Sequence, residues 1–127
     1  MNHAYEQEIR YHLLRILNKE PKLGQREMAK RIGICLGKVN YCVSELDAKG
    51  WIEITRLKSA MKRIPYIYML TPKGLEEKGK LTVWFLKRKL SEFEEIKKQI
   101  RELHNEVQQE GLDNPEGELN DAVKGII

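Results

Sequence analysis

The sequence predicts a mainly α-helical fold, of class α+β, that contains one two-stranded hairpin and a long C-terminal helix. Three observations predict it. Residues 25–44 read as two short helices around a glycine turn, and residues 51–70 contain two short β-rich runs. Residues 72–110 then carry an uninterrupted helical pattern. The chain has 127 residues, which suits one small domain and an extension.

The first expected element is an amphipathic helix over residues 5–18. Its apolar face repeats at helical spacing. The residues on it are Ile9, Leu13, Ile16 and Leu17. Pro21 ends this segment because a proline disfavours helical geometry in the residue before it. Leu23 is expected to pack inward and could form a very short strand.

Two helices around a tight turn follow, the second from about residue 36 to residue 49. Gly33 supplies the left-handed residue that ends the first of them, and the small Ala29 lets the second cross closely. Val39, Cys42 and Val43 line the inner face of the second helix. This spacing is typical of a DNA-binding helix-turn-helix; the alternative is an ordinary helical hairpin in a core.

The hairpin comes next. Gly50 suits the end of the preceding helix, and residues 51–56 and 66–70 are rich in β-branched and aromatic residues. The tip between them, residues 57–65, carries Lys58, Lys62 and Arg63. Three helices followed by a hairpin with a basic tip is the element order of a winged helix-turn-helix.

The long helix is expected to begin at Thr71 and Pro72, since threonine caps helix starts and proline suits the first helical position. It runs to about residue 110, and Gly111 and Pro115 end it. We therefore predict a DNA-binding domain over residues 1–80, a dimerisation helix that forms a coiled coil over residues 81–110, and a flexible tail over residues 111–127.

Charge and composition narrow the function. Residues 1–80 hold sixteen Lys and Arg against nine Asp and Glu, a net +7, while residues 81–127 hold seven against ten, a net −3. The predicted DNA-binding part is therefore the basic one, as a phosphate-binding surface requires. No membrane span, secretory signal, metal spacing, cofactor motif or catalytic constellation is visible, so we expect a cytoplasmic protein that is not an enzyme and has no metal or cofactor.

The candidate DNA-binding residues lie on three segments. The outer face of the third helix faces the major groove in this arrangement, with Asn40 suited to adenine and Lys38 to guanine or a phosphate. The start of the second helix favours phosphate. The full set is Gln25, Arg26, Leu36, Gly37, Lys38, Asn40, Tyr41, Ser44, Lys58, Lys62 and Arg63. Cys35 begins the third helix, either as a redox-sensitive thiol or as a neutral residue that caps poorly.

The second half of the long helix carries an apolar stripe with heptad spacing, which predicts self-association. The candidate dimer-interface residues are Leu86, Leu90, Phe93, Ile96, Ile100, Leu103 and Val107. Charged residues flank the stripe in a pattern that suits either a parallel or an antiparallel pair.

Over residues 5–110 the chain resembles the MarR family of bacterial transcription regulators, in particular short members associated with exopolysaccharide genes. The resemblance rests on QREMAKRIGICLGKVNYCVSELDAKGWIE and on YMLTPKGLEEKGKL, whose Leu70, Thr71 and Gly74 match the family's LT-x-x-G junction. It implies a homodimer that binds double-stranded DNA at a palindromic operator, usually as a repressor.

Two departures from the family pattern limit what the resemblance implies. Only a few residues precede the first helix here, whereas family members with a ligand pocket usually carry a longer N-terminal helical segment, so a small-molecule effector is not expected. The wing has Lys62 and Arg63 in place of the usual Asp-Arg pair. The alternative function is a winged helix that binds proteins, with the coiled coil recruiting a partner.

Overall fold

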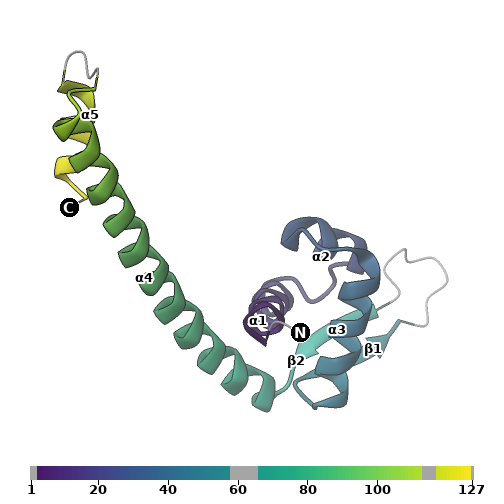
Figure 1. Ribbon diagram of the computed structural model, residues 1–127. Helices are drawn as coiled ribbons and strands as arrows, with labels where there is room; N and C mark the ends of the chain where they lie inside the picture. The colour runs from purple at the N-terminus through teal and green to yellow at the C-terminus, as the bar shows by residue number, and fades with distance from the viewer. Residues whose placement is uncertain (1–2, 58–65, 113–116, 127) are drawn as a thin grey trace. The chain divides into compact units, whose positions relative to one another are not determined.

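The computed structural model describes residues 3–57, 66–112 and 117–126. Its elements are α1 (His3–Lys19), α2 (Gln25–Ile32), α3 (Leu36–Ala48), β1 (Ile52–Arg56), β2 (Tyr66–Leu70), α4 (Pro72–Gln109) and α5 (Glu118–Lys124) (Figure 1). The chain forms two compact units, Met1–Phe85 and Leu86–Ile127, which divide within α4. This division lies five residues beyond the expected end of the DNA-binding domain.

The core of the first unit is built largely from apolar faces that the sequence predicts, but on α1 Leu14 is fully buried and the expected Ile16 is only partly buried. Side chains less than 2% exposed come from α1, α2 and α3, so the three helices share one interior. They are Ile9, Leu13, Leu14, Leu17, Met28, Val39, Cys42, Val43 and Leu46. The first turns of α4 close this core: Leu81 is 4% exposed, and the Phe85 ring stacks on Tyr11 at 4.6 Å between centroids.

Two glycines end helices as expected. Gly33 has φ +82° after α2, and Gly50 has φ +75° after α3, which is the left-handed region that favours glycine. The Gly33 amide donates to the Ala29 carbonyl at 2.8 Å, and Ala29 itself is buried. The chain therefore turns sharply between the two helices, and the small Ala29 side chain fits the core beside α3.

The hairpin is antiparallel, with Ile52 opposite Leu70 and Ile54 opposite Tyr68. Ile52 and Tyr68 face the core, at 2% and 4% exposed. The Tyr68 amide also donates to the Pro21 carbonyl at 2.8 Å, so the loop between α1 and α2 is held against β2. Leu23 packs against the core as expected, but the structure assigns no strand to it, because this loop makes one such bond rather than a ladder.

The start of α4 is fixed to the base of the hairpin. The Thr71 hydroxyl donates to the Gly50 carbonyl at 2.6 Å and accepts the Gly74 amide at 3.0 Å, which confirms Thr71 as the cap. The Thr71 amide donates to the Trp51 carbonyl at 3.0 Å. These bonds tie the residues on either side of the hairpin together, and the Leu70, Thr71 and Gly74 junction therefore has a structural role.

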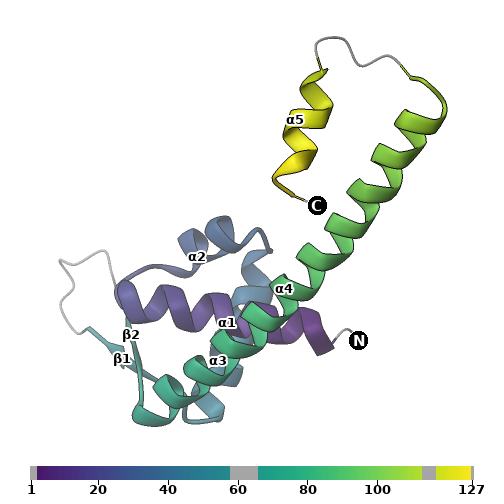
Figure 2. The same cartoon turned by 90° about the vertical axis from the view of Figure 1, so that its left-hand side faces the viewer.

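The second unit consists of the rest of α4 and α5. Residues 118–124, which we expected to lie in a flexible tail, form the helix α5, which turns back beside the end of α4 (Figure 2). Asn120 Oδ1 accepts from Gln108 Nε2 at 2.9 Å and lies 2.9 Å from His104 Nε2. No helix in the described part of the chain is long and apolar enough to cross a bilayer.

Candidate nucleic-acid interface

The outer face of α3 is open to solvent, as a major-groove surface requires. Leu36 and Tyr41 are 40% and 58% exposed, and Gly37, Asn40 and Ser44 are also exposed. The opposite face is completely buried by the core of the first unit. The sequence therefore assigned the inner and outer faces of this helix correctly.

Lys38 differs from the rest of this face because it already has a partner. Its Nζ lies 2.6 Å from Glu6 Oε1, and Glu6 is a buried carboxylate on α1. The hydrogen bond to Glu6 raises the pKa of Lys38. The ammonium also lies 5.4 Å from the centre of the Tyr41 ring. In this structure Lys38 joins α3 to α1 through one of its three donors, and the contact with Glu6 restrains where the ammonium can reach.

Asn40 and Gln25 were predicted to contact DNA separately, but the structure brings them together. Asn40 Nδ2 donates to Gln25 Oε1 at 3.3 Å, and Gln25 Nε2 donates to the Tyr68 hydroxyl at 3.3 Å. Three elements, α3, α2 and β2, therefore meet through one line of polar side chains. The sequence analysis did not identify Tyr68 as part of the site, since its place in an alternating strand indicated only packing.

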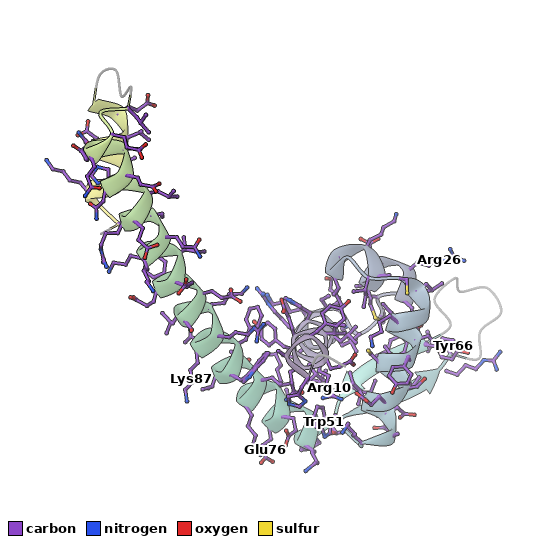
Figure 3. All side chains as sticks on the ribbon, viewed as in Figure 1. Arg10, Arg26, Trp51, Tyr66, Glu76 and Lys87 are labelled. Carbon is purple, nitrogen blue, oxygen red and sulfur yellow. The ribbon has the colours of Figure 1, made fainter. Side chains whose placement is uncertain are left out.

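A second polar pair sets the orientation of α3 on α1. Arg10 Nε lies 2.7 Å from Glu45 Oε1, and both side chains are largely buried, at 15% and 23% exposed. The hydrogen bond from Arg10 lowers the pKa of Glu45 (Arg10 is labelled in Figure 3). Together with the Glu6–Lys38 pair, this contact holds α3 to α1 at two points, which lie nearly two turns apart along α3 and about one turn apart along α1.

Two further basic residues, both on α2, differ in what surrounds them. Arg26 is exposed near the start of α2, which begins after Gly24 without a side-chain cap, so its first-turn amides are available to a phosphate (Figure 3). Arg31, by contrast, pairs with Glu20 and Glu27. The wing residues Lys58, Lys62 and Arg63 lie outside the described residues.

The predicted dimer stripe in the second unit is largely uncovered. Leu86, Leu90, Phe93, Ile96 and Leu103 are 51–61% exposed, whereas Ile100 and Val107 are half-buried. Positions 86, 93, 100 and 107 recur every seven residues, with 96 and 103 between them, so these side chains follow one face of α4. No group of three or more metal-ligating side chains occurs in the parts of the chain that the structure describes.

The order of the elements and the exposed outer face of α3 together define a winged helix-turn-helix with a long C-terminal helix. Residues 6–53 match the family described as winged helix-turn-helix DNA-binding. No curated protein sequence matches the chain.

Solved structures of transcription regulators share this fold. PcaV from Streptomyces coelicolor, in complex with its natural ligand, has a TM-score of 0.59 at 22% identity, over 79% of this chain and 72% of that one. The Mycobacterium tuberculosis MarR family protein Rv2887, in complex with salicylic acid, has a TM-score of 0.56 at 18% identity, over 80% and 74%. A MarR/EmrR family regulator from Acinetobacter sp. ADP1 has a TM-score of 0.55 at 18% identity, over 79% and 75%. The expected resemblance to MarR-family regulators is thereby confirmed in the fold.

Proposed function

We propose that this protein is a sequence-specific DNA-binding transcription regulator that acts as a homodimer. The observation that carries the proposal is the outer face of α3, which stays exposed and polar around Asn40 and Ser44 while the inner face is buried. A helix with one such face at the surface of a winged helix-turn-helix fits the major groove. The basic charge of residues 1–80 supports the same assignment, since phosphate contacts supply much of the affinity.

The exposed stripe of α4 supports the homodimer. Five large apolar side chains on one helical face are still 51–61% exposed, so covering the remaining surface of each would contribute about 1 kcal/mol. A second copy of the same helix offers the matching stripe, and two-fold pairing is the commonest arrangement in soluble oligomers. A symmetric dimer carries two recognition helices and therefore binds two inverted half-sites, which predicts a palindromic operator.

The finer assignments come from the family resemblance. Repression, action in a bacterial cytoplasm and control of polysaccharide genes are part of the proposal, and the similar regulators of known structure agree with the general role. The protein-binding alternative predicts an apolar outer face on α3. Asn40 and Ser44 favour DNA instead, although Leu36 and Tyr41 add some apolar surface there.

The absence of a small-molecule effector stays a prediction, and the comparisons do not support it. PcaV was solved with its natural ligand and Rv2887 with salicylic acid, so proteins of this fold bind small molecules. Salicylic acid, the ligand of Rv2887, is the first compound to test. A rise in melting temperature with release of DNA would contradict the prediction.

The test is to select genomic DNA fragments with the full-length protein and to measure affinity for the enriched site. We expect one palindromic sequence to be enriched. Asn40→Ala should weaken binding to it by about 1–3 kcal/mol and relax the preference at one base pair. Asn105→Ala, an exposed position on α4, is the control and should bind as the wild type does. A library with no enriched sequence would contradict the proposal.

A further inference from the structure

A line of three polar side chains runs from the wing strand to the recognition helix. Tyr68 on β2 is 4% exposed, Gln25 at the start of α2 is half-buried, and Asn40 on α3 is exposed. Gln25 lies between the other two and contacts both at 3.3 Å. The most buried member is thus at one end of the line, and the member that faces the solvent is at the other.

The hydrogen bonds in this line have a definite direction. A side-chain amide offers one acceptor oxygen and two N–H donors. Gln25 presents its oxygen to Asn40 and its nitrogen to the Tyr68 hydroxyl, so Asn40 must present its own nitrogen to Gln25. Asn40 keeps two groups for another partner: the Oδ1 acceptor and the second Nδ2–H donor.

The Tyr68 end of the line is firmly held. The Tyr68 side chain is buried in the core, and its backbone amide donates to the Pro21 carbonyl at 2.8 Å. The position of the hydroxyl is therefore set by β2 and by the loop between α1 and α2. Through Gln25, this fixed hydroxyl restrains the rotation of the Asn40 amide.

We propose that Gln25 and Tyr68 are positioning residues that orient Asn40 to read adenine in the major groove. The inference rests on the proposed function and replaces the phosphate contact expected of Gln25. An acceptor beside a donor matches the N6 amino group and N7 of adenine, whereas guanine presents two acceptors, O6 and N7. Because Gln25 already accepts one of the two Nδ2–H groups, Asn40 cannot turn both donors toward guanine.

The experiment uses the full-length protein and the selected operator. Each adenine of one half-site is replaced in turn by a purine that lacks the 6-amino group, and the ratio of dissociation constants is measured. For the wild type we expect one position to give a ratio of about 5- to 100-fold. Gln25→Ala and Tyr68→Phe should each lower that ratio by about 2- to 10-fold, because a hydrogen bond that orients Asn40 is lost.

Two controls separate orientation from structural damage. Tyr66→Phe removes the hydroxyl of the exposed tyrosine on the same strand and should keep the wild-type ratio. Affinity for unrelated duplex DNA should be unchanged in the Gln25→Ala and Tyr68→Phe variants, whereas a damaged domain would bind every sequence less well. In the Asn40→Ala background, Gln25→Ala should have no further effect on the ratio.

The possible outcomes distinguish this inference from the proposed function. If the protein selects a specific operator but Gln25→Ala keeps the wild-type ratio of dissociation constants, the inference is wrong and the proposed function stands. A guanine at the Asn40-dependent position would also overturn it, because guanine O6 and N7 are both acceptors and require two donors from the protein. Binding without any sequence preference by the wild type would overturn both.

Discussion

Among the glycines that the structure describes, Gly74 is the one at which an added Cβ meets other atoms within 4 Å. A Cβ built on it would lie 1.8 Å from the Trp51 carbonyl oxygen, and a backbone atom cannot move away as the end of a side chain can. That same carbonyl accepts the Thr71 amide, so it is fixed from a second direction. Gly79, one and a half turns further along α4, has no atom within 4 Å of its Cβ position.

We therefore predict that Gly74→Ala lowers the free energy of unfolding by at least about 2 kcal/mol through overpacking. Gly79→Ala, the matched change in the same helix, should raise it by about 0.5–1 kcal/mol, because alanine favours helix more than glycine does. Urea denaturation at one fixed protein concentration measures both. Equal effects of the two changes would show that the contact with Trp51 does not limit position 74.

The contact between Arg10 and Glu45 should make the free energy of unfolding depend on pH. The hydrogen bond from Arg10 lowers the pKa of Glu45 in the folded protein, so the unfolded chain binds the proton more readily. The stabilisation is therefore complete above the ordinary pKa of glutamate, about 4.3, and is lost as the pH falls through the lower pKa of the folded state.

Glu45→Gln should remove this dependence. Between about pH 5 and pH 3 the wild type should lose about 1 kcal/mol more stability than the variant, a modest value because the pair keeps some contact with solvent. Glu53→Gln, at an exposed position on β1, is the control and should follow the wild type. Parallel pH curves for the wild type and Glu45→Gln would contradict the role of the Arg10 contact.

At the scale of elements, α3 begins without a side-chain cap. Cys35 occupies the cap position and makes no hydrogen bond there, while Cys42 lies in the core, where burial raises the pKa of its thiol. A hydroxyl at position 35 can accept one of the free amides of the first turn, whereas a hydroxyl at position 42 would be buried, since Cys42 is 0% exposed.

Serine substitution should accordingly act in opposite directions at the two cysteines. We expect Cys35→Ser to raise the free energy of unfolding by about 0.5–1 kcal/mol, because serine is a good N-cap. Cys42→Ser should lower it by about 1–3 kcal/mol, because it buries a hydroxyl. Thermal denaturation of both variants under reducing conditions is the measurement. A destabilised Cys35→Ser protein would show that the thiol contributes more than its cap position indicates.

The helices and strands were largely predictable because their limits are set by local chemistry. Gly33, Gly50 and Pro72 mark helix ends or starts by their backbone preferences, and the structure places the boundaries there. The apolar faces followed from periodicity for the same reason. The short α5 was missed because an acidic segment with several glycines shows little helical pattern.

The polar contacts of the candidate site were much harder to predict. Glu6 and Lys38 are 32 residues apart, and Gln25 and Tyr68 are 43 apart. Such contacts depend on how the helices and strands pack against one another, and a local sequence pattern does not predict that packing. The sequence thus identified the exposed face of α3. It did not show that Lys38 pairs with Glu6 or that Asn40 donates to Gln25.

At the scale of the whole molecule, the apolar stripe of α4 predicts a dimer in solution. Phe93→Asp with Leu103→Asp places two charges on exposed positions of the stripe, and burying them in a dimer would be strongly unfavourable. We expect the wild type to sediment as a dimer at micromolar concentrations and this variant as a monomer that binds the operator far more weakly.

The control places acidic residues on the opposite side of the same helix. Lys98→Asp with Asn105→Asp changes two exposed positions. Each lies five residues after a stripe position, 93 or 100, which puts it on the side of α4 that faces away from the stripe. This variant should remain dimeric in analytical ultracentrifugation. A wild-type monomer, or a stripe variant that stayed dimeric, would contradict the proposed interface.

The bonds from Thr71 to Gly50 and Trp51 also bear on how such a protein can evolve. They close the chain at the base of the hairpin, so the start of α4 is secured independently of the segment between β1 and β2. Doubling the number of residues between two fixed ends costs only about 0.6 kcal/mol in closure entropy. Descendants of this sequence can therefore gain or lose residues between the two strands, and so acquire new DNA preferences, while the anchorage of the long helix is inherited unchanged.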